Sequence, residues 1–581
     1  MKTNNVTNQT FFLSKVSLCK ILIIGFFGFY LISNFAPYYD TADGYTLATI
    51  GIKLSQGQYA ITNELLENTG KFEFKPGDWA NTIDPSYAVP LGPIGFHLWA
   101  SFLYSLTGNF GLFYFGPISG ILLLIVSERV STKLFGKYVG LLAILFLVTN
   151  HIFLRSAVSF QTESSATILF LLGFYFLIKF IKNLSNLSIF LTSLFLSVAT
   201  FVRINNIIFF PVELIFLFSY FIFEHLRTKN NKKSLYQKSF SKSAFKKSAL
   251  LLIPWIIFFS FWFGYHDFFF GDPFTTQIII QRGEGTTDKE ISSFFELESR
   301  HFENIKQYSK YLLPYQFPAM ESSLFQNFDP LFGKFWLGII SILILLSGII
   351  ISLKTQDHRK EIFVICFFIL STVWFYSALT SEDRASYGVP GRYMFPAFIL
   401  FYMIIGFLIT KIFSIDKKRI PIFGLKIIKI FVIICLIIFF GSSIYFTPFG
   451  QAIFNGTFEI QNPFELSLNH PPDLEGLKKN NVIVALKTDR ILEYDVIPFQ
   501  IVPIDDKIAP PDSISLLKNI LSEDYSVFIF KTPTTIHEKI VFQDLADNHE
   551  IIFSDFSKSF CILSIKNNEN TITQNDQICL E

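Results

Sequence analysis

Long apolar runs without charge constrain this chain more than any other feature of its sequence. Residues 21–32, 337–352 and 431–440 contain no Asp, Glu, Lys or Arg. A helix needs about 20 apolar residues to cross the hydrocarbon core of a bilayer, and uncharged runs of this kind are typical of such helices. Since 51% of the 581 residues are hydrophobic, the sequence predicts an integral membrane protein rather than a water-soluble one.

We expect a mainly α fold, a polytopic transmembrane helical bundle of about eleven spans that occupies residues 1–447. The expected spans are residues 16–36, 110–127, 138–157, 164–182, 187–203, 205–225, 248–266, 336–353, 361–379, 393–413 and 428–447. The first run follows Lys15 and Lys20 but lacks a small-residue cleavage site, so we expect it to be retained as an anchor.

One further apolar segment, residues 90–107, is too short to cross the membrane. Pro90 and Pro93 delay its helix, leaving roughly 13 helical residues, or about 20 Å, against a hydrocarbon core of about 30 Å. Its polar side chains follow helical spacing and fall on one side: His97, Ser101, Tyr104 and Ser105. We therefore expect an amphipathic helix that lies in the membrane interface.

The distribution of basic residues determines the expected orientation. If residues 90–107 do not span, every strongly basic short segment lies on the same side as the N-terminus: 129–137, 227–247, 354–360 and 417–419. Basic loops are retained on the cytoplasmic side of a membrane. We therefore expect the N-terminus to be cytoplasmic. We expect the protein itself to lie in the plasma membrane of a prokaryote. The outer face would then carry the loops 37–109, 267–335 and 380–392.

The polar segment 448–581 follows the last expected span, and we expect it to form a small extracytoplasmic α/β domain. Helices are expected at residues 473–479 and from Asp512 or Ser513 to residue 521. Strands are expected at residues 482–486, 526–531, 549–553 and 560–565. Cys561 and Cys579 could form a disulfide in an oxidising compartment or remain free thiols, and the sequence favours neither.

Charged residues stand at the outer ends of several expected spans. Asp40 and Asp43 follow the first span, and Glu163 precedes the fourth. Arg203 ends the fifth span, and the pair Arg392–Tyr393 leads into the tenth. An ionisable group at a span boundary is costly unless it is paired, hydrated or functional. These positions are therefore candidate site residues.

This arrangement resembles the GT-C superfamily of membrane glycosyltransferases, which includes protein O-mannosyltransferases and bacterial aminoarabinose transferases. The resemblance covers residues 16–450, mostly as architecture with short motifs. Asp43 and Gly57 match the family's spacing between an acidic residue after the first span and a glycine further on. Many relatives have Asp-Glu where this chain has Asp43-Gly44, which leaves open whether Asp40 shares the role of Asp43.

The resemblance implies an enzyme that transfers a sugar from a polyprenyl-phosphate-linked donor to an acceptor hydroxyl, with inversion at the sugar carbon. Asp43, or Asp40, would take the proton of the acceptor hydroxyl. Fixed cations suit the departing lipid phosphate, and the implied donor-binding residues are Arg203, Arg392, Tyr393 and His97. Glu163 would orient the donor or, with Asp43, hold a divalent cation such as Mg²⁺ or Mn²⁺, which is optional in the family.

Other interpretations stay open from the sequence. Asp43 could cap a helix, Glu163 likewise, and Arg203 could reach lipid headgroups. The chain could be a secondary transporter or a lipid flippase, or an inactive relative that acts as an assembly partner. The sequence contains no P-loop or GxGxxG motif, which would indicate nucleotide binding. It also contains no Trp-Trp-Asp motif, which would favour an oligosaccharyltransferase. The expected partners are the lipid-linked donor, a protein, lipid or glycan acceptor, and membrane lipids, but not nucleic acid.

Overall fold

The computed structural model describes most of the predicted transmembrane region and the strands of the C-terminal segment. The described residues are 15–35, 42–57, 59–62, 79–81, 87–90, 94–229, 234–273, 304–305, 308–309, 312, 334–355, 358–379, 390–414, 427, 429–434, 436–437, 440, 481–486, 500–504, 526–530, 550–556 and 560–566. The predicted helices at 473–479 and 512–521 lie outside them.

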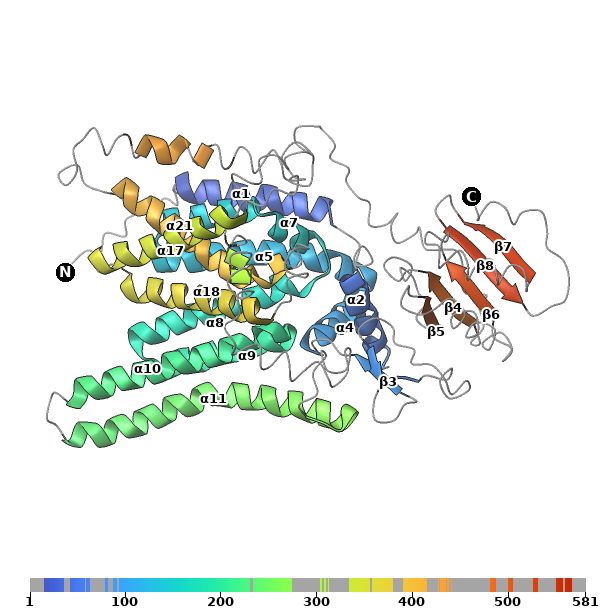
Figure 1. Cartoon of the computed structure of the whole chain (residues 1–581), viewed down its shortest axis with the longest axis horizontal. Coiled ribbons are helices and arrows are strands. Elements are labelled where there is room, and N and C mark those ends of the chain that lie inside the picture. Colours follow the sequence, from blue (N-terminus) through green and yellow to red (C-terminus); the bar gives the residue numbers. More distant parts are fainter. Residues whose placement is uncertain are drawn as a thin grey trace, which may run out of the picture.

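A bundle of long helices forms the body of the protein (Figure 1). Its helices are α1 (Lys15–Ser33), α5 (Asn109–Phe135), α6 (Lys137–Val148), α7 (His151–Val158), α8 (Thr162–Asn183), α9 (Asn186–Val202), α10 (Phe209–Lys229), α11 (Ser234–Phe270), α17 (Lys334–Thr355), α18 (Arg359–Leu379), α20 (Pro390–Tyr393) and α21 (Phe395–Ser414). The short 3₁₀ helix η2 (Ile204–Ile208) joins α9 to α10. The mainly α polytopic fold predicted from the sequence is confirmed.

Six helices of the described part are long and apolar enough to cross a membrane. A seventh span results if α6 and α7, which meet at an angle of 76°, are counted together. Shorter apolar helices cover Asn186–Val202, Ile204–Ser219 and Ile340–Lys354. The chain is an integral membrane protein, whereas the count of about eleven spans stays a prediction, because most of residues 428–447 lies outside the described residues.

The predicted span 138–157 is not one straight helix. It breaks between α6 and α7, where Asn150 caps the second helix by accepting a hydrogen bond from the backbone N–H of Phe153 at 2.9 Å. The Asn150 amide also donates to the hydroxyl of Tyr402 on α21 at 2.5 Å. A residue that satisfies the first turn of a new helix in this way favours a fresh start over a continuous helix.

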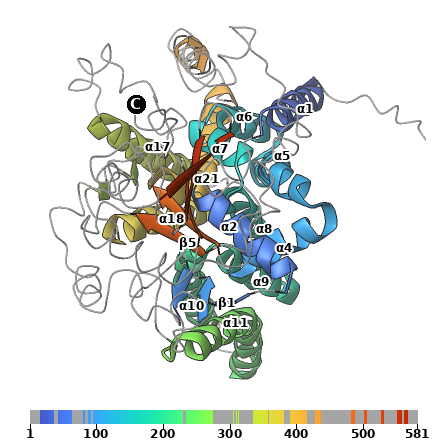
Figure 2. The ribbon, with the colours of Figure 1, turned by 90° about the vertical axis from the view of Figure 1, so that its right-hand side faces the viewer.

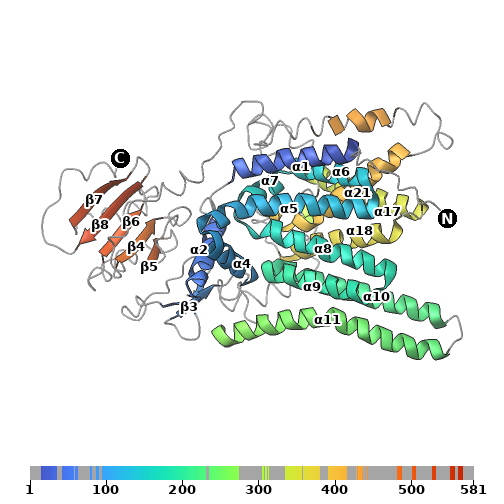
Figure 3. The ribbon, with the colours of Figure 1, turned by 180° about the vertical axis from the view of Figure 1, so that it is seen from behind.

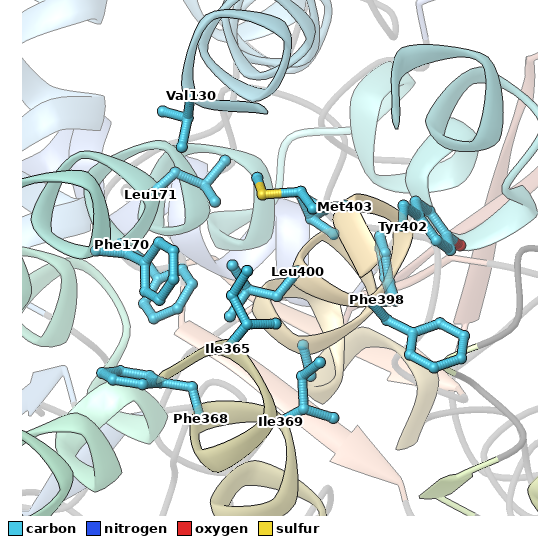
Figure 4. Close-up of a cluster of buried hydrophobic side chains, with 14 of the residues drawn as sticks. Val130, Phe170, Leu171, Ile365, Phe368, Ile369, Phe398, Leu400, Tyr402 and Met403 are labelled. Carbon is cyan, nitrogen blue, oxygen red and sulfur yellow. The ribbon is translucent and has the colours of Figure 1, made fainter. Parts of the chain in front are cut away.

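Aromatic packing fills the interior of the bundle. Phe170 of α8 lies 4.4 Å from Phe209 and 5.9 Å from Phe368 of α18, measured between ring centroids. Figure 4 shows this region, where side chains from α5, α8, α18 and α21 interlock around Phe170, Leu171, Ile365 and Leu400. Large apolar side chains also lie exposed on the outside of the bundle, as lipid-facing helices require.

Two shorter helices, α2 (Ala42–Ser55) and α4 (Ile94–Thr107), pack together at one end of the bundle, which we call the α2/α4 end (Figures 1 and 3). A Cβ at Gly51 would lie 3.0 Å from the backbone carbon of Ala100, so the helices approach at backbone distance. A small sheet of order β1-β3-β2 adjoins them, formed by β1 (Ile61–Thr62), β2 (Trp79–Asn81) and β3 (Tyr87–Pro90). The end of α10 and the start of α11 lie at the opposite end.

The short helix predicted within residues 90–107 is α4, with 14 residues. Its predicted polar side does not face water as a whole, because His97 is fully buried against the bundle. Ser105 is exposed as predicted, but the large side chains that are exposed on this helix are apolar: Leu98, Trp99, Phe102 and Leu106. This apolar stripe suits a helix that lies in the interface with its apolar face toward the acyl chains.

The C-terminal segment contains a five-stranded sheet of order β5-β4-β6-β8-β7. The strands are β4 (Asn481–Leu486), β5 (Gln500–Ile504), β6 (Ser526–Phe530), β7 (Glu550–Phe556) and β8 (Phe560–Lys566). β4 runs parallel to β5 and β6, whereas β8 is antiparallel to β6 and β7. Four strands match the prediction. The fifth, β5, was missed because it contains Pro503, and proline is tolerated mainly on edge strands such as this one.

Candidate functional site

A buried carboxylate and an arginine meet where α8 begins and α9 ends. These helices form an antiparallel hairpin, which brings Glu163 in the first turn of α8 beside Arg203 at the C-cap of α9. The Arg203 Nη1 atom lies 2.5 Å from Glu163 Oε1 and donates a hydrogen bond to the Thr162 hydroxyl at 3.1 Å. The Glu163 side chain is only 3% exposed and that of Arg203 12%. The pair is therefore largely shielded from water.

A second arginine approaches the same carboxylate oxygen from α20. The Arg392 Nε atom lies 3.8 Å from Glu163 Oε1, and its side chain is 32% exposed. A guanidinium has five N–H donors in a planar fork, so one arginine can bind a carboxylate and a second anion at the same time. The more exposed Arg392 is the better placed of the two to meet a ligand.

An aromatic ring lies beside both guanidinium groups. The Cζ atoms of Arg203 and Arg392 are 5.4 and 5.6 Å from the centroid of the Tyr393 ring, within cation–π distance. The Tyr393 ring stacks on Tyr376 of α18, with centroids 5.2 Å apart and planes 18° from parallel. The hydroxyl of Tyr376 donates to the carbonyl of Asn205 at 3.2 Å. We call Glu163, Arg203, Arg392 and Tyr393 the arginine cluster.

The helix that carries Asp43 shares a buried apolar cluster with residues that neighbour Glu163 and Arg203 in the sequence. Asp43 lies in the first turn of α2, and Asp40 lies outside the described residues, as does the Asp43 side chain. A buried apolar cluster joins α2 to residues on either side of the arginine cluster: Leu47, Ala48, Phe160, Ala166 and Val202. In the view from the α2/α4 end, α2 and α4 lie in front of α8 and α9 (Figure 2).

Known structures share this architecture, although no protein-family model matches the sequence and no curated protein does. The chain is similar to ArnT, an aminoarabinose transferase, from Cupriavidus metallidurans in the apo state, with a TM-score of 0.50 and 10% sequence identity. The match covers 95% of this chain and 98% of that one. The chain has a GT-C fold. The resemblance predicted from the sequence is thus confirmed for the fold.

Two further solved structures are similar to the chain at lower TM-scores. One is ArnT from Cupriavidus metallidurans bound to undecaprenyl phosphate, with a TM-score of 0.47, 10% identity and coverage of 94% of this chain and 97% of that one. The other is the oligosaccharyltransferase AglB from Archaeoglobus fulgidus in complex with an inhibitory peptide and a dolichol-phosphate, with a TM-score of 0.45 and 12% identity. That match covers 96% of this chain and 75% of AglB.

His97, the remaining predicted donor-binding residue, lies on α4 and is fully buried. Within the described part of the chain, neither of its buried ring nitrogens has a hydrogen-bond partner. Burial lowers the pKa of His97 to about 3, so the imidazole is neutral near pH 7. It would therefore offer a phosphate no positive charge. A packing role fits better, because a Cβ at the nearby Gly95 would lie 2.6 Å from the carbonyl oxygen of Phe201 on α9.

The described residues of this GT-C fold contain no group of three or more His, Cys, Asp or Glu side chains that could hold a metal ion. Glu163, one of the two expected metal ligands, instead faces two guanidinium groups. Neighbouring cations disfavour a divalent cation at that carboxylate. The Asp43 side chain lies outside the described residues, so we assign no step of the chemistry to a metal.

The sequence predicted all four residues of the arginine cluster as site residues but did not predict Tyr376, whose ring packs against the cluster. Glu163, Arg203, Arg392 and Tyr393 were each expected near an outer span end, and the structure brings them together. Tyr376 was not expected, because a tyrosine inside an apolar span gives no signal of its own. The roles of all these residues stay predictions.

Proposed function

We propose that this chain is a membrane glycosyltransferase that moves a sugar from a polyprenyl-phosphate-linked donor to an acceptor hydroxyl. The observation that carries the proposal is the arginine cluster, in which two guanidiniums converge on one buried carboxylate beside a tyrosine ring. Arginine forks of this kind match the oxygen atoms of phosphate in pairs. The GT-C fold and the motif around Asp43 support the same chemistry.

The position of the cluster favours a lipid-linked donor. It lies at the α2/α4 end, opposite the end where α10 finishes at Lys229. The positive-inside rule places the basic segment 227–247 in the cytoplasm and therefore places the cluster outside. Nucleotide sugars do not reach that face, whereas a polyprenyl chain dissolves in the bilayer beside the exposed apolar side chains of the bundle.

The proposed reaction is a single displacement with inversion. The oxygen of the acceptor hydroxyl forms a bond to the anomeric carbon, and the Asp43 carboxylate takes the proton of that hydroxyl. The bond from that carbon to the phosphate oxygen breaks, and polyprenyl phosphate departs with its electron pair. Arg203 and Arg392 stabilise the charge that develops on the phosphate. Glu163 positions both arginines rather than reacting.

Release of free polyprenyl phosphate, measured by mass spectrometry, tests the proposal. Purified protein in lipid nanodiscs would meet a panel of polyprenyl-phosphate sugars together with an outer-surface extract as acceptor. We expect release by the wild type, loss in Asp43→Asn and Arg392→Gln, and wild-type release in Arg129→Gln, an exposed arginine on α5 outside the site. No release by the wild type with any donor, with or without Mg²⁺ or Mn²⁺, would overturn the proposal.

A further inference from the structure

Part of the long loop 267–335 is built into the bundle beside the arginine cluster. The described residues of this part are Asn304, Ile305, Tyr308, Ser309 and Leu312, and all but Ile305 are fully buried. The side-chain amide of Asn304 donates to the carbonyl of Ser377, near the end of α18, at 3.0 Å. We call these five residues the docked segment.

The docked segment adds a third ring to the stack behind the arginines. Tyr308 stacks on Tyr376, with centroids 6.1 Å apart and planes 27° from parallel. Tyr376 in turn stacks on Tyr393, whose ring lies beside Arg203 and Arg392. Three rings from three separate parts of the chain thus form a continuous column that ends at the two guanidiniums.

Tyr376 is held on several sides within this column. Tyr308 covers it from the loop, Tyr393 covers it from α20, and its hydroxyl is bonded to the carbonyl of Asn205, two residues after Arg203. Protein interiors are close-packed, so a ring removed from one position allows its neighbours to shift into the space. Loss of the Tyr308 ring would release Tyr376 and, through it, Tyr393.

We infer that Tyr308 is a positioning residue for phosphate binding, which acts through Tyr376 and Tyr393 on the two arginines. The inference rests on the proposed function, because it assumes that the arginines bind the donor phosphate. A guanidinium recognises phosphate well only while its plane is fixed, since its advantage over lysine lies in that geometry. The donor phosphate therefore binds tightly only while Asn304 and Tyr308 stay packed against α18.

Native mass spectrometry of the full chain in nanodiscs tests the inference, with decaprenyl phosphate and decaprenol as the two probes. Tyr308→Ala should weaken binding of the phosphate about tenfold, equivalent to 1.4 kcal/mol, and leave decaprenol binding unchanged. Tyr308→Phe keeps the ring and should bind as the wild type does. Phe180→Ala removes an equally buried ring near the far end of α8 and should lower thermal stability without changing phosphate affinity.

The outcomes separate this inference from the proposed function. If the wild-type protein binds decaprenyl phosphate and decaprenol equally well, it has no phosphate site, and the proposed function fails. Wild-type protein that prefers the phosphate, together with equal affinity in Tyr308→Ala, would overturn the role of Tyr308 alone. If Tyr308→Ala does not fold, Asn304→Ala replaces it, because that change loosens the docked segment by removing its bond to Ser377. An unchanged phosphate affinity in Asn304→Ala would then overturn the inference.

Discussion

The two ends of α8 carry ion pairs that differ in design. Near its C-terminus, Lys182 pairs with Glu361 in the first turn of α18, and the Lys182 side chain is 43% exposed. His358 also approaches Glu361, at 3.5 Å. At its N-terminus, Glu163 receives two arginines that are less exposed and lie beside an aromatic ring.

The difference teaches what each pair is suited to do. A lysine is a flexible point charge that can connect two helices. Because water competes for it, an exposed lysine pair contributes little to stability. A guanidinium that lies against a ring is fixed in direction, so its donors can be aimed at a ligand. We therefore interpret the Lys182 pair as a structural tie and the arginine cluster as a binding site.

The largest expected effect comes from breaking each ion pair in turn. Arg203→Gln leaves the buried Glu163 with a weaker set of partners, and we expect a loss of about 3 kcal/mol in the free energy of unfolding. Lys182→Gln removes the more exposed cation and leaves the buried Glu361 with His358 as a partner, so it should cost less, about 1 kcal/mol. Chemical denaturation in detergent would compare them. Equal losses in both variants would erase the distinction, and Glu163→Gln combined with Arg203→Gln should recover part of the larger one.

The buried histidine at the α2/α4 end should make the protein sensitive to acid. His97 has a pKa of about 3 in the folded chain, against about 6.5 when unfolded. As pH falls below 6.5 the unfolded chain binds a proton that the folded chain excludes, so stability decreases until pH reaches the folded value. The decrease amounts to about 3 kcal/mol at pH 4.5.

His97→Phe should remove most of this pH dependence, whatever its effect at neutral pH. The midpoint of thermal unfolding, measured at about pH 7.5 and 4.5 for both proteins, compares the two slopes across the window in which His97 titrates. Identical slopes would show that His97 is not excluded from water in the folded protein.

At Gly95, α4 lies close to the last turn of α9, just before Arg203. A Cβ at Gly95 would lie 2.6 Å from the carbonyl oxygen of Phe201 and 2.8 Å from its carbonyl carbon. Backbone atoms cannot move aside cheaply, so Gly95→Ala should destabilise the protein by about 2 kcal/mol. Gly25→Ala is the matched control, because its Cβ would meet nothing within 4 Å. Thermal unfolding would compare the two, and a neutral Gly95→Ala would refute the close approach of α4 and α9.

The smallest expected effect sharpens the contrast between fork and point charge. Arg392→Lys keeps the charge but loses the planar donors, and should reduce release of polyprenyl phosphate about tenfold. Lys182→Arg, at the other end of α8, should leave release unchanged. Steady-state rates with a saturating acceptor would measure both. An active Arg392→Lys would mean that charge alone is needed at this position.

The sequence predicted the helices well because long apolar runs act locally, as do Pro90 and Pro93, which precede the start of α4. It also predicted that Glu163, Arg203 and Arg392 share one face, since alternating spans place every second boundary on the same side. Tyr308 and Tyr376 could not be predicted, because ring stacking depends on which helices become neighbours. The break at Asn150 was missed for a similar reason, since its amide is bonded to Tyr402 on a distant helix.

The apolar stripe of α4 has a consequence for how the protein responds to its lipids. Leu98, Trp99, Phe102 and Leu106 are exposed apolar side chains that favour contact with acyl chains, so we expect α4 to follow the surface of the monolayer. Gly95, at the start of the same helix, lies against the backbone of Phe201, two residues before Arg203. We therefore expect a thinner or thicker bilayer to shift the support of the arginine cluster and, on the proposed function, to change the affinity for the lipid-linked donor.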